Sequence, residues 1–454
     1  MKTYINPLKD TWDELLERPT FSVKELMDQV QTILTEIRTG GIDTIRKYTE
    51  KFDGVFIQDI SISETEIAEA SGQINQNLKE AIQIAAANIR KFHESQIPVT
   101  RRIETTSGVT CWQKAVAIDK VGLYIPGGSA PLFSTVLMLA IPAKIAGCKE
   151  IVLCTPPDKN GKINPSILFA AQVVGVSKIY KLGGIQAIAA MAYGVDCVPK
   201  VNKIFGPGNQ YVMAAKQLVS ISDVAIDMPA GPSEVAIMAD STANPAFIAA
   251  DLLSQAEHGP DSQVVLVTND ASLVEKVDQE LALQLEELPR KAIAEKALAN
   301  SQAIVLDHID EMIELINGYA PEHLIIAMKD YMNVSERITN AGSVFLGNYT
   351  PESAGDYASG TNHTLPTNGW ARSFSGVNLD SYLKKITFQE ITQEGIQNLG
   401  PIIETMAAAE LLDAHKNAVT LRLKEIGKVV SDQSQLLENG KVRCWDDEKI
   451  RNKK

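Results

Sequence analysis

Hydrophobic positions follow two different periods along the chain. Residues 22–52 and 79–95 carry apolar side chains at helical spacing, with polar residues between them. From Ala115 onward, short β-branched runs that end in Gly or Pro alternate with alanine-rich helical stretches. Alternation of this kind indicates βαβ units and parallel sheets.

Nine of these runs are predicted to be strands: Val121–Ile125, Ile151–Cys154, Lys178–Leu182, Lys203–Phe205, Val235–Met238, Val264–Val267, Ile304–Leu306, Leu324–Ala327 and Ser343–Leu346. Nine strands are too many for one ordinary open sheet. The prediction is therefore an α/β protein with two Rossmann-like domains that contain parallel sheets, plus a helical C-terminal appendage. Beyond Asp380 no strand is expected, and the predicted helices there are Leu399–Ala409 and Asp413–Ile426.

The predicted domain bounds follow from these elements. The break between the α/β domains is placed near Met228–Ser233. The predicted parts are an N-terminal extension (1–21), a first α/β domain (22–123 with 234–380), a second α/β domain (124–233) and a helical C-terminal segment (381–454).

Length and composition narrow the class of protein. A chain of 454 residues exceeds the size of one core, in agreement with two domains. A net charge of -13 argues against binding to nucleic acid or to an anionic membrane. The N-terminus shows no secretory signal, and no apolar run of about eighteen residues occurs. Five scattered cysteines without a Cys-x-x-Cys favour structural thiols in a reducing cytoplasm.

One stretch, Asp251–Asp261, combines a helix end with two potential ligands. Asn244-Pro245 predicts the helix start, and Gly259-Pro260 predicts its end. Gln255 and His258 are three residues apart, so they would share a face of the last turn, where free carbonyls favour a cation. This is a plausible half of a metal site. Taken alone, the stretch favours the alternative, in which His258 only caps the helix.

Glycine-rich loops follow three of the predicted strands. They are Tyr124–Pro131, Leu182–Ala187 and Phe205–Asn209. A strand followed by such a loop and a helix can bind phosphate through backbone amides. None of the three has a recognised nucleotide-binding spacing, so each taken alone favours a tight turn.

The segment Tyr319–Leu324 places an acid beside an imidazole. Pro321 ends the preceding helix and a buried strand follows, so Glu322 and His323 lie at a helix-to-strand junction. Such a pair can share proton transfer. Alone, the pair favours a polar surface loop.

Two further segments carry titratable side chains. The long, irregular segment Thr350–Pro366 is bounded by apolar runs, which indicates a functional loop. Asp356 in it is a candidate oxygen ligand. Asp413 would cap the last helix and place His415 in its first turn, although helical histidines are common. The titratable residues of the long segment are Glu352, Asp356 and His363.

Together these motifs closely resemble the histidinol dehydrogenase family. The resemblance runs in order over roughly residues 20–428, and no functional position departs from the family pattern. The residues before it and the charged end after Ile426 lack family motifs. The motifs are Gly122–Gly128, Gly206–Asn209, Asp227–Glu234, Ser254–Ser262, Pro321–His323, Ala341–Gly347, Ser353–His363 and Ala414–Val419.

The resemblance implies a cytoplasmic, zinc-containing and NAD-dependent enzyme of histidine biosynthesis. It would oxidise L-histidinol through L-histidinal to L-histidine in two hydride transfers, and it would act as a homodimer with shared active sites. By this resemblance, zinc is bound by Gln255, His258 and Asp356 of one subunit and by His415 of its partner. The substrate contacts are Ser233, Gln255, His258, His323, Asp356, Glu410 and His415, and the NAD contacts are Tyr124, Gln186 and Asn209.

The resemblance also suggests roles in proton transfer. His323 would act as the general base, and Glu322 would activate water in the second oxidation. Three alternatives are a zinc hydrolase that uses metal-bound hydroxide, a thiol mechanism like that of aldehyde dehydrogenases, and a metal-binding module without catalysis. Cys148 and Cys154 lie in predicted core elements, which argues against the thiol mechanism.

Overall fold

The computed structural model describes residues 1–19, 23–127, 130–229 and 231–438, with side chains as far as residue 428. The predicted charged end after Ile426 therefore lies largely outside the described residues. The structure divides into two units. The first comprises Met1–Ile97 and Ala117–Leu383, and the second comprises Pro98–Val116 and the chain from Lys384.

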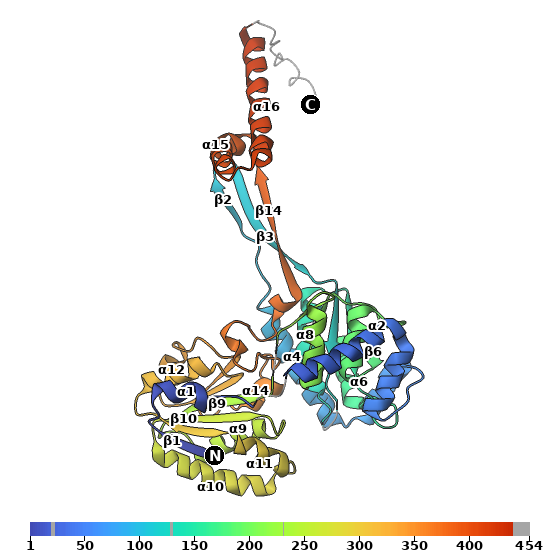
Figure 1. Cartoon of the computed structure of the whole chain (residues 1–454), viewed down its shortest axis with the longest axis vertical. Coiled ribbons are helices and arrows are strands. Elements are labelled where there is room, and N and C mark those ends of the chain that lie inside the picture. Colours follow the sequence, from blue (N-terminus) through green and yellow to red (C-terminus); the bar gives the residue numbers. More distant parts are fainter. Residues whose placement is uncertain (20–22, 128–129, 230, 439–454) are drawn as a thin grey trace, which may run out of the picture. The chain divides into compact units, whose positions relative to one another are not determined.

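The first unit contains a six-stranded parallel sheet of order β1-β11-β10-β9-β12-β13 (Figure 1). Helices α9–α11 pack on one face of this sheet and α1, α12 and α13 on the other. The strands are β1 (Lys2–Ile5), β9 (Glu234–Ala239), β10 (Gln263–Thr268), β11 (Gln302–Val305), β12 (His323–Ala327) and β13 (Ser343–Leu346). The helices are α1 (Trp12–Leu15), α9 (Pro245–Ala256), α10 (Ala271–Glu287), α11 (Lys291–Ala299), α12 (Ile309–Tyr319), α13 (Tyr331–Ser335) and α14 (Glu352–Tyr357).

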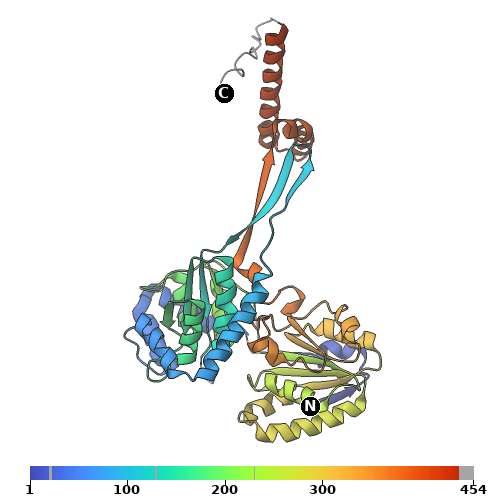
Figure 2. The ribbon, with the colours of Figure 1, turned by 180° about the vertical axis from the view of Figure 1, so that it is seen from behind.

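The same unit contains a five-stranded parallel sheet of order β6-β5-β4-β7-β8 (Figure 2). Helices α3–α6 cover one face, and α2, α7 and α8 cover the other. The strands are β4 (Lys120–Tyr124), β5 (Glu150–Thr155), β6 (Lys178–Lys181), β7 (Lys203–Phe205) and β8 (Ala225–Ile226). The helices are α2 (Val23–Asp53), α3 (Glu64–Ala70), α4 (Gln76–Glu94), α5 (Phe133–Ala146), α6 (Pro165–Val174), α7 (Gly184–Tyr193) and α8 (Gln210–Ser220).

The strand order of the five-stranded sheet reverses beside β4. The chain proceeds from β4 through β5 to β6 on one side, and then returns to the other side with β7 and β8. In open α/β sheets, ligands bind in the crevice at the carboxyl ends of the strands where the order reverses. The carboxyl ends of β4 and β7 therefore mark a binding position.

The second unit combines a three-stranded sheet of order β14-β3-β2 with two helices that pack on each other. Its elements are β2 (Arg102–Thr106), β3 (Val109–Ala117), β14 (Leu383–Ile391), α15 (Gln393–Ala409) and α16 (Asp413–Glu438). Strands β2 and β3 form an antiparallel pair. Throughout the described residues, helices fall short of the length and apolarity that crossing a bilayer requires.

The nine predicted strands and the two parallel sheets are confirmed. The absence of strands beyond Asp380 is wrong, because β14 follows almost at once. This strand is exposed along most of its length and lacks the continuous apolar run of a buried strand. The exposed strands β1 and β2 were missed for the same reason.

The predicted domain bounds also need correction. Residues 22–123 were assigned to the first domain together with 234–380, but α2 packs on α7 and α8, and α4 packs on α5. These N-terminal helices therefore belong with the five-stranded sheet. Hydrophobic periodicity shows that a helix buries one face, and it does not show which sheet receives that face.

A buried ion pair holds the loop after β7. Lys216 Nζ lies 2.5 Å from Asp227 Oδ1, and both side chains are 1% exposed. Lys216 also donates to the Gly206 carbonyl at 2.7 Å, and the Gly206 N–H donates to Asp227 Oδ2 at 2.8 Å. Gly206 has φ 128°, and a Cβ there would lie 2.1 Å from the Tyr124 carbonyl oxygen. The pair therefore satisfies both polar groups of a residue that must be glycine.

Lys216→Met should destabilise the protein by about 3–5 kcal/mol, because it leaves the buried Asp227 carboxylate without its cation. The matched control is Lys178→Met, since Lys178 pairs with Glu150 but is 52% exposed. The control should cost less than about 1 kcal/mol. Urea denaturation monitored by circular dichroism measures the free energy of unfolding of both variants. Equal decreases would show that the buried pair stabilises the protein no more than the exposed pair.

Candidate active site

The predicted acid–base pair lies at the start of a central strand. Helix α12 ends at Tyr319, Ala320 has a left-handed φ of 53°, and β12 begins at His323. Glu322 and His323 are 6% and 4% exposed. The predicted helix-to-strand junction is confirmed, whereas the alternative of a surface loop is wrong. The pair occupies the amino end of β12 rather than the carboxyl end.

Backbone groups of Glu234, on the neighbouring strand β9, hold both side chains. Its N–H donates to Glu322 Oε2 at 3.0 Å. Its carbonyl oxygen lies 3.3 Å from His323 Nδ1. Since a carbonyl only accepts, this contact places a proton on Nδ1, so Nε2 carries the free lone pair whenever the imidazole is neutral. Nε2 lies 3.6 Å from Asp356 Oδ1 and makes no hydrogen bond within the described part of the chain.

Helix α9 positions Gln255 and His258 from the other side. It begins at Pro245 after the Asn244 cap and ends at Ala256, so His258 lies just beyond the helix, and its N–H donates to the Gln255 carbonyl at 3.2 Å. The Gln255 side chain is fully buried. In the orientation that satisfies its neighbours, its nitrogen donates to Glu352 Oε1 and its oxygen accepts from the Glu234 N–H at 2.8 Å.

Helix α14 supplies two carboxylates from the segment that was expected to be irregular. Glu352 and Asp356 are four residues apart and share one face of this short helix. Ligand atoms of His323, Glu352 and Asp356 all lie within 4.8 Å of one another. From the sequence, Glu352 is only one of the titratable residues of the long segment, and no ligand role is predicted for it. Its position directly after Pro351, with an aspartate four residues on, was the signal that could have identified it.

Burial and charge shift the pKa values of these groups strongly. Burial raises the pKa of Glu322 to about 8, against the opposing effect of His323. Burial also raises the pKa of Glu352 well above its usual range. For His323, burial lowers the pKa, but Glu352, Glu322 and Asp356 outweigh it and raise the pKa to about 10. Burial lowers the pKa of His258, although Asp356 acts in the opposite direction.

This environment suits a divalent cation. The carboxyl groups of Glu322, Glu352 and Asp356 all lie within 4 Å of the His323 ring. Glu352 Oε2 and His323 Nε2 have no hydrogen-bond partner among the described residues. Asp356 and His258 are near enough to affect each other's charge. Imidazole, carboxylate and amide donors are ligands that Zn²⁺ accepts without cysteine.

The end of the α14 segment reaches the five-stranded sheet. His363 Nδ1 lies 2.9 Å from the Asp356 carbonyl oxygen, and His363 Nε2 lies 3.1 Å from Thr135 Oγ1. Asn362 donates to the Met138 carbonyl at 2.6 Å. Thr135 and Met138 belong to the first turns of α5, which follows β4. Hydrogen bonds therefore connect the segment that carries the candidate metal ligands to the carboxyl edge of the five-stranded sheet.

The three residues predicted to contact NAD surround that edge. Tyr124 ends β4, and its hydroxyl accepts from the Gly184 N–H at 3.2 Å. Gln186, near the start of α7, donates to Asp53 Oδ2 at 3.2 Å, and its buried oxygen lacks a partner within the described residues. Asn209 caps α8 by accepting from the N–H groups of two following residues. Tyr124 and Asn209 follow β4 and β7, where the strand order reverses, whereas Gln186 follows the edge strand β6 in the helix whose Gly184 contacts Tyr124.

The remaining predicted substrate residues are more exposed. Ser233 is half-buried and immediately precedes β9. Glu410 follows α15 and His415 lies in the first turn of α16, as predicted; both belong to the second unit and are exposed there.

Cysteines 148 and 154 are buried, as predicted. Burial raises the pKa of the Cys148 thiol to about 12 and that of Cys154 still further. A thiol that stays protonated is a poor nucleophile, which disfavours the thiol mechanism.

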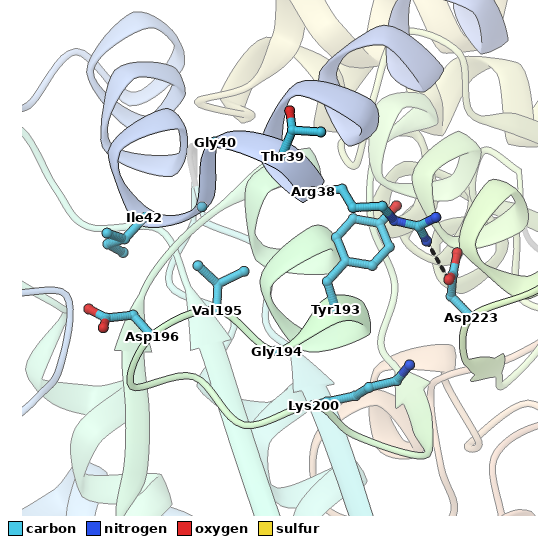
Figure 3. A pocket seen from close by; sticks show the side chains of 11 residues that line it. Arg38, Thr39, Gly40, Ile42, Tyr193, Gly194, Val195, Asp196, Lys200 and Asp223 are labelled. Atoms are coloured by element: carbon cyan, nitrogen blue, oxygen red, sulfur yellow. Dashed lines mark ion pairs between the residues drawn. The ribbon is translucent and has the colours of Figure 1, made fainter.

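A surface hollow of about 660 Å³ lies away from these residues (Figure 3). It is formed around the kink of α2 and the end of α7. Arg38 stacks over the Tyr193 ring at 4.2 Å and pairs with Asp223, so its charge is already compensated. None of the candidate site residues lines the hollow.

Comparisons with known proteins identify the family of this chain. The histidinol dehydrogenase family matches residues 16–423. A histidinol dehydrogenase from Bacteroides thetaiotaomicron is 62% identical over 426 residues, which cover 94% of this chain and 100% of that protein. The chloroplastic histidinol dehydrogenase of Arabidopsis thaliana is 52% identical, with 91% of this chain and 89% of that protein covered.

A solved structure shows the same similarity. The crystal structure of histidinol dehydrogenase from Elizabethkingia anophelis superposes with a TM-score of 0.92 at 57% identity. The superposition covers 94% of this chain and 99% of that one. With the family match spanning most of the sequence, this chain belongs to the histidinol dehydrogenase family.

Proposed function

We propose that this chain oxidises L-histidinol through L-histidinal to L-histidine, with two NAD⁺ consumed per turnover, in the histidine biosynthesis of the cytoplasm. The observation that carries the proposal is the buried pair of Glu322 and His323 beside the Glu352 and Asp356 carboxylates, in a chain of this family. Two separate proton-transfer groups suit two successive oxidations better than a single hydrolysis.

Zinc would be held by Gln255, His258 and Asp356, with His415 of the partner subunit as the fourth ligand. When bound, zinc would engage nitrogen donors of the substrate and hold the substrate in position for both oxidations. A dication among these carboxylates would also oppose their effect on His323 and lower its pKa toward neutrality. Ser233 and the partner subunit's Glu410 would complete the substrate contacts.

His323 would be the general base of the first oxidation. The Glu234 carbonyl fixes the proton on Nδ1, so the free lone pair of Nε2 can accept the hydroxyl proton of the alcohol as hydride leaves for NAD⁺. The same atom would deprotonate the hydrate in the second oxidation. Asp356, 3.6 Å from Nε2, would stabilise the imidazolium that forms.

Glu322 would activate water for attack on the aldehyde. One of its oxygens, Oε2, accepts from the Glu234 N–H at 3.0 Å, a donor that it shares with the Gln255 oxygen, so the other oxygen is left to accept a proton from water. Burial raises its pKa to about 8, which makes it a stronger base than an exposed glutamate once it is ionised. NAD⁺ would bind against Tyr124, Gln186 and Asn209 at the carboxyl edge of the five-stranded sheet.

The proposed enzyme is a homodimer that shares its two active sites. The second unit supports this proposal, because large apolar side chains of its two helices and of the turn between them are exposed in the single chain. Such surfaces commonly become interfaces. The exposed residues are Ile402, Met406, Leu411, Leu412 and Leu421.

The first test is an assay with metal removal. Purified protein with histidinol and NAD⁺ should form two NADH per histidinol, measured at 340 nm. Dialysis against a chelator should abolish the activity, and stoichiometric zinc should restore it. Cys154→Ser should retain turnover because that thiol is buried and protonated. A zinc hydrolase would form no NADH, and loss of turnover in a folded, zinc-loaded Cys154→Ser protein would support the thiol mechanism.

Glu322→Gln should slow histidinal oxidation by about 100-fold or more, and histidinol oxidation by less than about tenfold. The amide keeps the size and the hydrogen bond but cannot take a proton from water. Stopped-flow measurement with each substrate separates the two steps. Equal losses in both steps would remove the role assigned to Glu322. Because each base works only when deprotonated, wild-type histidinal oxidation should also rise from pH 6 to 9; the part of the rise that Glu322 contributes should be lost in the variant, while the part that His323 contributes should remain.

His415→Asn and Gln255→Asn should each give inactive homodimers, since each removes one zinc ligand from every site. Mixing the two proteins under conditions of subunit exchange should restore up to about a quarter of wild-type activity. Half of the dimers are then hybrids, and each hybrid contains one intact site. Native mass spectrometry would verify the exchange, and complete exchange without recovery would exclude a shared site.

A further inference from the structure

An arginine from the N-terminal segment anchors the residue that holds the catalytic pair. Arg18 Nε donates to Glu234 Oε2 at 2.6 Å, and these side chains are 15% and 2% exposed. The other carboxylate oxygen of Glu234 accepts from the Asn368 N–H at 2.6 Å. The side chain of Glu234 is thus fully engaged away from the site, while its backbone faces Glu322 and His323.

The same guanidinium also binds the segment that carries the pair. Arg18 donates a second hydrogen bond to the Tyr319 carbonyl at 2.8 Å, and it stacks over the Tyr319 ring at 4.1 Å. Tyr319 ends α12, three residues before Glu322. One planar cation therefore joins the start of β9 to the α12–β12 junction. These are the two chain segments whose relative position sets the contacts of Glu322 and His323.

We propose that Arg18 is a positioning residue for Glu322 and His323, acting through Glu234 and Tyr319; the proposal rests on the proposed function. Arg18 touches neither reacting group. Its contribution is to keep the Glu234 N–H and carbonyl in register with the carboxylate and the imidazole. Displacement of a catalytic group by about 1 Å can cost about 100-fold in rate, so such an anchor has a measurable effect.

Arg18→Met and Arg18→Lys test the proposal, with Lys9→Met as the matched control. Lys9 lies in the same segment and pairs with Glu314, but both side chains are more than half exposed. Arg18→Met should lower kcat for histidinal oxidation about tenfold or more, while KM for histidinal and NAD⁺ and the zinc content change less than about twofold. Arg18→Lys keeps the charge but not the fork that reaches two acceptors, so its rate should fall between those of Arg18→Met and wild type. Lys9→Met should match wild type.

A double-mutant cycle with Glu322→Gln separates positioning from general destabilisation. Because Arg18 is proposed to orient both groups, Arg18→Met should cost at least about threefold less in the Glu322→Gln background than in wild type, since one of the two groups is already inactive there; the loss that remains is the part that acts through His323. Equal losses in the two backgrounds would overturn the proposal, as would wild-type kcat in Arg18→Met. If Arg18→Met does not fold, Arg18→Lys enters the cycle under the same criteria. Failure of the wild-type protein to oxidise histidinol would instead reject the proposed function itself.

Discussion

Burial of excess negative charge around one imidazole is the constraint on which the rest of this structure depends. Glu322, Glu352 and Asp356 surround His323 in a place that water scarcely reaches. An uncompensated buried carboxylate costs several kcal/mol. The chain compensates part of this cost with the Glu234 N–H, the Gln255 amide and the imidazole itself. The negative charge that is not compensated makes the cluster suited to a cation. The same buried carboxylates and imidazole therefore favour both metal binding and proton transfer.

The position of this cluster follows from the direction of the chain. In a parallel α/β sheet each helix runs back from the carboxyl edge to the amino edge, so the end of α9 and the start of β12 meet at the amino edge. The negative end of the α9 dipole adds to the field that attracts a cation. The nucleotide candidates use the opposite arrangement, in which helix starts and glycine loops meet at the carboxyl edge of the five-stranded sheet. Each sheet thus contributes the edge whose electrostatics match its proposed ligand.

Local sequence signals predicted much of this organisation. The nine apolar runs became strands, Asn244-Pro245 started α9, and Pro321 separated α12 from β12. Non-local relations could not be obtained in the same way. Nothing in residues 23–94 shows which sheet their helices cover, and β14 is too exposed to have a strand-like apolar run. Glu352 was overlooked because its neighbours His323 and Gln255 are distant in sequence. For Gln255, His258 and Asp356, family resemblance supplied the ligand set, which their spacing alone left open.

The link between the two sheets bears on the proposed hydride transfer, because the proposed NAD contacts and the candidate metal cluster belong to different sheets. Polar contacts tie them, including His363 to Thr135 and Asn362 to the Met138 carbonyl. A hydrogen bond adds only about 1 kcal/mol net, but a buried group that loses its partner costs about 1–3 kcal/mol. Asn362 is 7% exposed, so this hydrogen bond stabilises the contact mainly because breaking it would leave a buried amide without a partner. His363 joins these contacts to the Asp356 backbone, so the segment that supplies a proposed zinc ligand would also set its distance from a nicotinamide bound at the other sheet. In the proposed function, one continuous stretch of chain, from Glu352 to His363, would therefore set both the metal position and its distance from the cofactor.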